Sequence, residues 1–333
     1  MILHALEAAL ERRLPWLASL GDDTDCVRLL HGAAEGVPGL TIDRYGPILL
    51  LQTWKAPLEA DLPERAAELV SARVGAPLTA VWNHRAKGAG PYDAWHAPQI
   101  PVDPVGLEHG LSFDVRPRHR GRDPLLFLDF RVGRRRVRQA AAGRSVLNLF
   151  AYTCGIGVAA AAGGAREVLN VDFAASALEV GRRNAALNDV SSTFDTLHFD
   201  ALPVMRALAG QGNRDKRAGR RLPRPPVSQR TFDLVILDPP RWARSKYGAV
   251  DVVRDYQSLF KPAVLATSAG GRLLATNHVP TVDLDTWLEA LRRCADKAGR
   301  PLAHIEVLPP DPDVPSFDGR HPLKLAWCTL AEG

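Results

Sequence analysis

Residues 146–157 read VLNLFAYTCGIG, an apolar run typical of a buried strand that passes into a turn containing Gly155 and Gly157. Glycine at a strand-to-helix turn lets a ligand approach the backbone closely, and the amino terminus of the next helix favours a negatively charged group. Two glycines more often serve only the turn itself. The significance of this stretch therefore depends on the pattern around it.

The strand-then-helix pattern of this stretch recurs along the rest of the chain. Strands are predicted at 146–150, 168–171, 196–199, 232–237 and 272–276. Helices are predicted at 157–162, 174–187, 201–208 and 252–267. Such alternation predicts an α/β fold with a parallel sheet covered on both faces.

The C-terminal region departs from this alternation. After a predicted helix at 283–298, apolar runs at 302–308 and 323–330 are separated only by a loop rich in Pro, Asp and Gly. A connection without a helix predicts an antiparallel pair of strands. Five parallel strands followed by an antiparallel C-terminal hairpin give a seven-stranded, mostly parallel, Rossmann-like sheet. This is the layout of class I methyltransferases and differs from that of nicotinamide dehydrogenases.

The N-terminal third has a different pattern. The elements expected there are an amphipathic helix at 3–20, apolar strands that include 48–51 and 78–82, and a helix at 58–74. Turn-forming residues separate these elements, so residues 26–110 predict a small α+β module. We therefore expect two domains, 1–110 and 111–333.

The composition is that of a globular chain. Its 333 residues are 46% hydrophobic and 24% charged, which excludes collagen-like, low-complexity and coiled-coil chains. Apolar runs are too short to span a bilayer, and charges interrupt the start before a signal-peptide core could form. Four widely spaced cysteines form no Cys-x-x-Cys pair, which fits a reducing compartment without a structural metal site. We expect a cytoplasmic protein without a membrane partner.

Acidic residues stand where predicted strands end. Asp172 follows the glycine turn by about twenty residues, where a carboxylate can accept hydrogen bonds from ribose hydroxyls. Asp200 is placed to accept from an adenine amino group, and Asp238-Pro239-Pro240 ends the fourth strand. Singly, each acid is more often a helix N-cap, but strand ends line the ligand crevice of an open α/β sheet. The sequence also lacks a Gly-Lys-Ser/Thr phosphate loop, so the pattern indicates S-adenosylmethionine.

Further motifs are distributed along the chain. They are Phe127–Arg131 (FLDFR), Val146–Thr153 (VLNLFAYT), Gly163–Arg166 (GGAR), Val171–Asp172 and Arg183–Asn188 (RNAALN). Together they resemble the large-subunit (23S) ribosomal RNA methyltransferases. Two branches are close: cytosine-C5 enzymes with an N-terminal PUA domain, and guanine-N7 enzymes that form one half of a bifunctional protein.

The two branches match different parts of the sequence. Gly36–Gly46 (GVPGLTIDRYG) is similar to the module that follows the PUA domain in the cytosine branch. We expect no PUA domain in this chain. Asp238–Trp242 (DPPRW), followed by Ser245-Lys246 and Arg254-Asp255, is more similar to the guanine-N7 branch. The resemblance covers about residues 26–330.

The resemblance implies a cofactor, a substrate and a set of site residues. The cofactor is S-adenosylmethionine, and the substrate is a base of 23S rRNA or of a large-subunit precursor, with 1–110 recognising RNA and 111–333 holding the cofactor. The residues expected to bind the cofactor are Asn148, Phe150, Tyr152, Thr153, Gly155, Gly157, Asp172, Phe173, Asp200 and Asp238. Asp129 and Arg131 are expected to close over its methionine end, because arginine matches a carboxylate with two parallel hydrogen bonds. A surface ion pair is the alternative for these two.

The position of cysteine decides which atom we expect to be methylated. Methylation of cytosine C5 requires a cysteine thiolate that first adds to C6. The cytosine branch has this cysteine just past the fifth strand, where this chain has Thr276–Val279 (TNHV). Cys154, Cys294 and Cys328 are placed elsewhere. Guanine N7 or another base nitrogen chiefly requires alignment, so we predict a nitrogen target, with cytosine C5 as the alternative.

The target base is expected to contact the ends of the fourth and fifth strands. Asp238, Pro239, Pro240 and Asn277 are predicted to hold its edge, and Trp242 to stack on it. Core packing is the alternative for Trp242. His278 is either a proton acceptor or a polar loop residue.

Positive charge is concentrated in two arginine-rich segments, although the net charge is only +5. The first, residues 116–138, leads into the cofactor site and fits neutralisation of RNA phosphates. The second, the apparent insertion 213–230, is either a solvated loop or a second RNA contact. A small-molecule methyltransferase would have little use for these arginines. A non-catalytic RNA-binding protein with the same fold would not need the intact acids at the strand ends.

Overall fold

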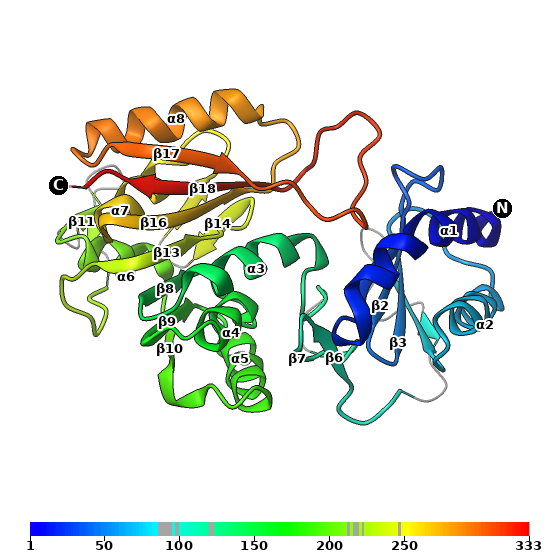
Figure 1. Ribbon diagram of the computed structural model, residues 1–333. Helices are drawn as coiled ribbons and strands as arrows, with labels where there is room; N and C mark the ends of the chain where they lie inside the picture. Colours follow the sequence, from blue (N-terminus) through cyan, green and yellow to red (C-terminus); the bar gives the residue numbers. More distant parts are fainter. Residues whose placement is uncertain are drawn as a thin grey trace. The chain divides into compact units, whose positions relative to one another are not determined.

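The structure is a computed structural model that describes residues 1–85, 95–96, 100–119, 123–211, 214–215, 220–221, 223–245 and 248–332 (Figure 1). For 95–96, 214–215, 220–221, 242–245 and 248–250 it describes the backbone alone. The chain forms two compact units. The first contains Met1–Arg131 and Pro310–Arg320, and the second contains Val132–Pro309 and His321–Gly333. The boundary predicted at residue 110 lies within the first unit.

The first unit is built on a five-stranded sheet in the order β1-β2-β3-β4-β5. Its strands are β1 (Cys26–His31), β2 (Leu40–Tyr45), β3 (Ile48–Thr53), β4 (Thr79–His84) and β5 (Trp95–His96). The β3–β4 pair is parallel and the other pairs are antiparallel. A separate hairpin joins β6 (Val105–Glu108) to β7 (Leu111–Asp114).

Two helices cover one face of this sheet. They are α1 (Ile2–Leu20) and α2 (Leu62–Val74), and the apolar core between helices and sheet includes Leu6, Leu10, Val70, Leu49 and Leu51. Helix α2 carries Pro63 in its first turn and ends at Gly75, whose φ of 69° closes the helix in the left-handed conformation. Sheet and helices together form the α+β module that the sequence predicted.

The second unit is built on a seven-stranded sheet in the order β10-β9-β8-β13-β16-β18-β17. Its strands are β8 (Ser145–Leu149), β9 (Glu167–Asp172), β10 (Phe194–His198), β13 (Phe232–Leu237), β16 (Thr267–Asn277), β17 (Leu302–Val307) and β18 (Lys324–Leu330). The first five are parallel, and β18 pairs antiparallel with both β16 and β17. This confirms the predicted sheet and its C-terminal hairpin. All five residues of β8 are buried, so both faces of this strand are covered.

The helices in this part of the chain are α3 (Arg131–Ala140), α4 (Gly155–Ala162), α5 (Ala175–Leu187), α6 (Ala201–Leu208), α7 (Gln257–Leu265) and α8 (Leu284–Lys297). Helices α4 to α7 connect the five parallel strands, whereas α3 precedes β8 and α8 lies between β16 and β17. Shorter elements are the 3-10 turns Gly21–Asp23, Leu128–Phe130 and Ser191–Thr193, and the strands β11 (Arg214–Asp215), β12 (Arg220–Arg221), β14 (Trp242–Ser245) and β15 (Gly248–Asp251). None of the helices within the described residues is both long and apolar enough to cross a membrane.

Three of the differences between the structure and the predicted elements are the following. Helix α3 was not predicted, because its arginine-rich sequence hides the apolar residues Val132 and Val137, which are buried. Helix α7 begins at Gln257 and not at residue 252, because the preceding residues form β15 and a turn in which Asp251 accepts from the Val253 N–H. Strand β16 begins at Thr267, five residues earlier than predicted.

Candidate active site

The strand order defines where a ligand is expected in the second unit. From β8 the chain continues to β9 and β10 on one side, whereas β13 and β16 follow on the other side. The carboxyl ends of β8 and β13 therefore flank the point where the strand order reverses. Ligands of open α/β sheets bind at such a point.

The loop that follows β8 has an unusual backbone. Phe150, Tyr152 and Cys154 have φ angles of 58°, 49° and 59°, and they are three of the six non-glycine residues with positive φ in the described part of the chain. Each non-glycine residue in this conformation costs about 1–3 kcal/mol, and such strain gathers at ligand sites. The binding role that the sequence predicts for this loop stays a prediction.

Asp172 ties this loop to the end of β9. Its Oδ2 accepts a hydrogen bond from the Tyr152 N–H at 2.8 Å, and its Oδ1 accepts from the Ala174 N–H at 2.8 Å. Burial raises the pKa of this carboxyl, and the backbone donors oppose that shift only in part. A carboxylate has about four acceptor positions, and acceptance from ribose hydroxyls by Asp172 stays a prediction. The next residue, Phe173, is an aromatic side chain that is 57% exposed.

Asp200 is the N-cap of α6. Its side chain accepts from the Leu202 N–H at 2.9 Å, so the capping alternative weighed for this residue is observed. The carboxylate is half-buried, and only its Oδ1 takes part in the capping hydrogen bond. An additional contact with adenine stays a prediction.

Two residues predicted to bind the cofactor have packing roles. Asn148 is buried, and its Nδ2 donates to Oδ1 of Asn170 at 2.9 Å. Gly157 faces the same side chain, since an added Cβ would lie 2.0 Å from Asn170 Oδ1. The missing side chain at position 157 thus allows α4 to approach β9. Thr153 is buried, while Tyr152 and Gly155 are half-buried.

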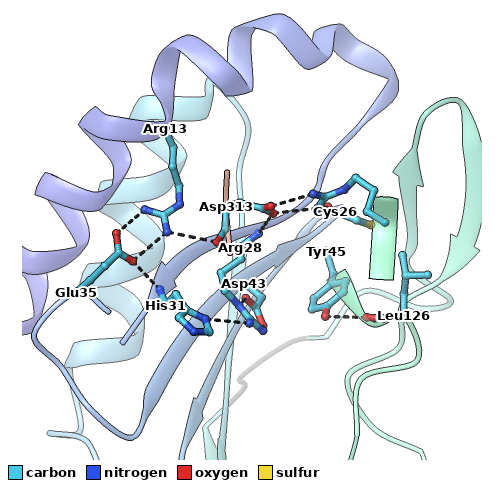
Figure 2. Close-up of polar contacts among 10 residues, drawn as sticks. Arg13, Cys26, Arg28, His31, Glu35, Asp43, Tyr45, Leu126 and Asp313 are labelled. Carbon is cyan, nitrogen blue, oxygen red and sulfur yellow. Dashed lines mark hydrogen bonds and ion pairs between the residues drawn. The ribbon is translucent and has the colours of Figure 1, made fainter. Parts of the chain in front are cut away.

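Asp129 and Arg131 belong to the first unit, and Arg131 has a carboxylate partner within the chain. The two terminal nitrogens of its guanidinium each lie 3.0 Å from one oxygen of Asp313, and Nη2 also donates to the Cys26 carbonyl at 2.6 Å. Figure 2 shows Asp313 beside Cys26 and Arg28. The paired hydrogen bonds expected with the cofactor are therefore made to Asp313. Asp129 is half-buried in its 3-10 turn.

The ends of β13 and β16 bring together a histidine and an aspartate. His278 Nε2 lies 2.7 Å from Asp238 Oδ1, which also accepts from the Thr276 hydroxyl. The side chains of His278 and Asp238 are 35% and 25% exposed, so a substrate can reach both. The contacts of Asp238 with His278 and with Thr276 both involve Oδ1. The sequence left the role of His278 open, although the position of this residue directly after the fifth strand was the available signal.

Asn277 lies between these residues in sequence and is buried. Its Oδ1 accepts from the Val279 N–H at 2.9 Å, whereas its buried Nδ2 has no hydrogen-bond partner among the described residues. A buried donor without a partner costs about 1–3 kcal/mol. Of the neighbouring predicted residues, Pro239 is buried and Pro240 is exposed. Trp242 lies in β14, but its side chain is outside the described part of the structure.

The cysteines are not arranged as nucleophiles. Cys26, Cys154, Cys294 and Cys328 are all buried and free. Burial raises the pKa of each thiol, that of Cys328 to about 12. Because the thiolate is the reactive form, none of the four is activated. The described residues also contain no group of three or more His, Cys, Asp or Glu side chains that could hold a metal ion.

Several arginines of the two basic segments pair with carboxylates. Arg116 bonds Asp114 at 2.6 Å, and Arg136 bonds Glu306 at 2.7 Å. In the second segment Arg230 bonds Glu167 at 3.0 Å. Outside the described residues lie Arg120, Arg122, Lys216 and Arg217, together with the side chains of Arg214, Arg220 and Arg221. Fewer arginines of the first segment are thus left for phosphates than the sequence suggested.

Comparisons with known proteins agree with this architecture. The family model for S-adenosylmethionine-dependent methyltransferases matches residues 28–210. A "Ribosomal RNA large subunit methyltransferase" of Deinococcus radiodurans is 32% identical over 305 residues, which cover 89% of this chain and 70% of that protein. A "Ribosomal RNA large subunit methyltransferase I" of Erwinia tasmaniensis is 30% identical over a region that covers 91% of this chain and 73% of that protein. A crystal structure of a methyltransferase complexed with SAH has the same fold, with a TM-score of 0.77, 22% identity, and 98% of this chain and 80% of that one covered.

Proposed function

Because the chain belongs to the family of S-adenosylmethionine-dependent methyltransferases, we propose that it methylates a base of 23S ribosomal RNA or of its large-subunit precursor. Support for the substrate comes from the names of the relatives, which are ribosomal RNA large subunit methyltransferases and match about nine-tenths of this chain. With an rRNA substrate, the location that we propose is the cytoplasm.

The cofactor site of this proposal is centred on the ends of β8 and β9. S-adenosylmethionine supplies a methyl group on a positively charged sulfur. The strained loop after β8, the carboxylate of Asp172 and the exposed ring of Phe173 are the groups of this chain that fit its nucleoside part. We place Asp200 beside its adenine and leave Arg131 out, because the Arg131 guanidinium is bonded to Asp313.

The target atom of this proposal is a base nitrogen, guanine N7 or an N–H nitrogen. The observation that carries it is the Asp238–His278 pair. Asn277, which precedes His278 in the sequence, adds a buried amide Nδ2 that has no partner among the described residues. Asn277 Nδ2 can donate to a base carbonyl or ring nitrogen, and Asp238 Oδ2 can accept from a base N–H. At an N–H nitrogen, Asp238 takes the proton that leaves as the nitrogen–methyl bond forms. At N7 no proton leaves, and the same groups only hold the base edge.

The four buried thiols support a nitrogen over cytosine C5. A covalent adduct at C6 needs a thiolate in contact with the base, whereas each cysteine here is buried with a raised thiol pKa. The residue in the expected nucleophile region is Asn277, whose amide cannot form such an adduct.

The proposal is tested by comparing ribosomal RNA from cells with and without the protein. Digestion to nucleosides and mass spectrometry should show one N-methylated nucleoside that disappears with the protein. Calorimetry with S-adenosylmethionine separates an enzyme from a non-catalytic scaffold, which would give no heat. RNA affinity is also measured as a function of salt concentration. An RNA methyltransferase should lose affinity steeply as salt rises, because salt weakens phosphate contacts, whereas a small-molecule methyltransferase should show no such RNA binding.

A further inference from the structure

The five-stranded sheet of the first unit has one face that α1 and α2 do not cover. Side chains alternate along β3, so Leu49 and Leu51 enter the core beneath the helices, while Ile48, Leu50 and Gln52 point to the opposite side. Strand β4 alternates in the same way. Ala80 and Trp82 face the helices, and Asn83 faces away from them.

Three polar side chains form a row across this second face. Gln52 is the register partner of Thr41 on β2 and of Asn83 on β4, so the three lie side by side. Thr41 Oγ1, Gln52 Nε2 and Asn83 Oδ1 are all buried and have no hydrogen-bond partner among the described residues. Gln52 and Asn83 are 3% and 6% exposed. Buried polar atoms without partners lower stability, so a row of three requires an explanation.

Gln52 and Asn83 line a pocket. Its other walls include Tyr45, Leu50, Val115 and Pro124, and it is a shallow recess that opens to solvent. The pocket thus combines apolar walls with a donor, Gln52 Nε2, and an acceptor, Asn83 Oδ1, on neighbouring strands. Ligand sites have this composition, with a few polar groups set in an apolar lining.

The charges around the pocket favour an uncharged ligand. Arg116, which lines it, is bonded to Asp114 at 2.6 Å, and Asp123, which also lines it, is bonded to Arg85 at 2.6 Å. Both charged residues of the lining are therefore paired with an opposite charge. A phosphate would have to compete with Asp114 for Arg116, whereas a neutral ring with polar edge atoms would leave both pairs intact.

We propose that this pocket binds the edge of an unpaired nucleobase of the RNA substrate. A nucleobase edge presents donors and acceptors side by side, which matches Gln52 Nε2 and Asn83 Oδ1, and its ring faces fit the apolar walls. The residues assigned to the methylated base belong to the second unit, so the base bound here is another nucleotide of the same RNA. The inference rests on the proposed rRNA substrate and assigns the first unit a specific recognition site.

The direct test replaces both amides by apolar side chains of similar size, Gln52→Met together with Asn83→Leu. Binding of 23S rRNA transcribed in vitro should weaken about 10- to 100-fold. The affinity for S-adenosylmethionine should not change, and Tm should not fall, because two unpartnered buried groups are removed. The matched control is Leu51→Met, on the same strand but on the helix-covered face, which should bind the RNA like the unaltered protein.

A second measurement uses the unaltered full-length protein. With glutamine side chains labelled with ¹⁵N, the Gln52 amide resonances should shift when a nucleoside 5′-monophosphate is added and should stay in place with inorganic phosphate. Absence of a shift with all four nucleotides would overturn the assignment, as would unchanged RNA affinity in the double variant. If the unaltered protein neither binds nor methylates 23S rRNA, the proposed function fails and the pocket assignment with it. If it methylates the RNA and the double variant binds equally well, only the pocket assignment fails.

Discussion

His278 Nε2 lies 2.7 Å from Asp238 Oδ1, and the two residues follow neighbouring parallel strands, β16 and β13. The hydrogen bond fixes the orientation of the carboxylate, which the Thr276 hydroxyl also contacts. The pair lies at the edge of the sheet where the strand order predicts a ligand. We therefore propose this pair as the centre of the reaction site.

Removal of either member of this pair should slow methyl transfer without weakening cofactor binding. We expect Asp238→Ala to lower kcat about 100-fold or more, and His278→Ala to lower it by a smaller factor, since His278 acts through Asp238. Calorimetry should give a nearly unchanged Kd for S-adenosylmethionine. His304→Ala, at an exposed position of β17, is the control. Equal losses of kcat and cofactor affinity would remove Asp238 from the substrate side of the site.

Replacement of Asp172 should act on the cofactor. Asp172→Ala deletes the predicted ribose acceptor and the hydrogen bond from the Tyr152 N–H that holds the strained loop, so binding of S-adenosylmethionine should become undetectable by calorimetry. Asp200→Asn keeps an acceptor for the Leu202 N–H and should leave Tm nearly unchanged. Unaltered cofactor affinity in Asp172→Ala would reject the site at the end of β9.

The buried cysteines should be dispensable for the chemistry. A variant with all four replaced by alanine should retain methylation if it folds, and iodoacetamide should not inactivate the unaltered protein, because its thiols are buried with raised pKa values. One cysteine whose single replacement abolishes turnover while RNA still binds would instead establish a covalent route to cytosine C5.

The contact between Arg131 and Asp313 should matter for stability. Asp313→Ala leaves the buried Arg131 guanidinium without its main partner and should destabilise the first unit by about 3–5 kcal/mol in urea unfolding. Cofactor affinity measured below the unfolding range should not change in this variant. A large loss of affinity in Arg131→Ala but none in Asp313→Ala would restore the cofactor role that the sequence suggested for Arg131.

The first unit should lose stability in acid through Glu35. Burial raises the pKa of its carboxyl, but hydrogen bonds from Arg13, from the His31 N–H and from Arg12 outweigh this and hold the pKa below its ordinary value. Figure 2 shows the contacts of Glu35 with Arg13 and His31. Such a group stabilises the fold above its unfolded pKa of about 4.3 and ceases to do so as pH falls through the folded pKa. Urea unfolding between pH 7 and pH 3 should show this loss. Glu35→Gln should be less stable at pH 7 and should depend less on pH.

The sequence predicted the fold well where periodicity and strand ends carry the information. The alternation from residue 146 onward specified the five parallel strands, and the loop between 308 and 323 specified the hairpin. Helix α3 was not predicted, because its many arginines obscure the spacing of its apolar residues. Contacts between distant residues were not predictable, since no local pattern shows that Arg131 pairs with Asp313, 182 residues further along the chain.

The candidate site was predictable in part for the same reason. Asp172 and Asp238 end strands, and this position can be recognised from sequence alone. The proximity of His278 to Asp238 depends on the pairing of β13 with β16, and the row formed by Gln52 and Asn83 depends on the register of β3 and β4. Sequence periodicity does not fix either register.

The identity of the methylated nucleoside tests the central claim most directly. Purified protein is incubated with methyl-labelled S-adenosylmethionine and deproteinised 23S rRNA from cells that lack it, and the digested RNA is analysed by mass spectrometry. We predict one labelled nucleoside with the methyl group on a base nitrogen, formed far more slowly by the Asp238→Ala variant. Label in 5-methylcytidine, or no label in the RNA at all, would contradict the account.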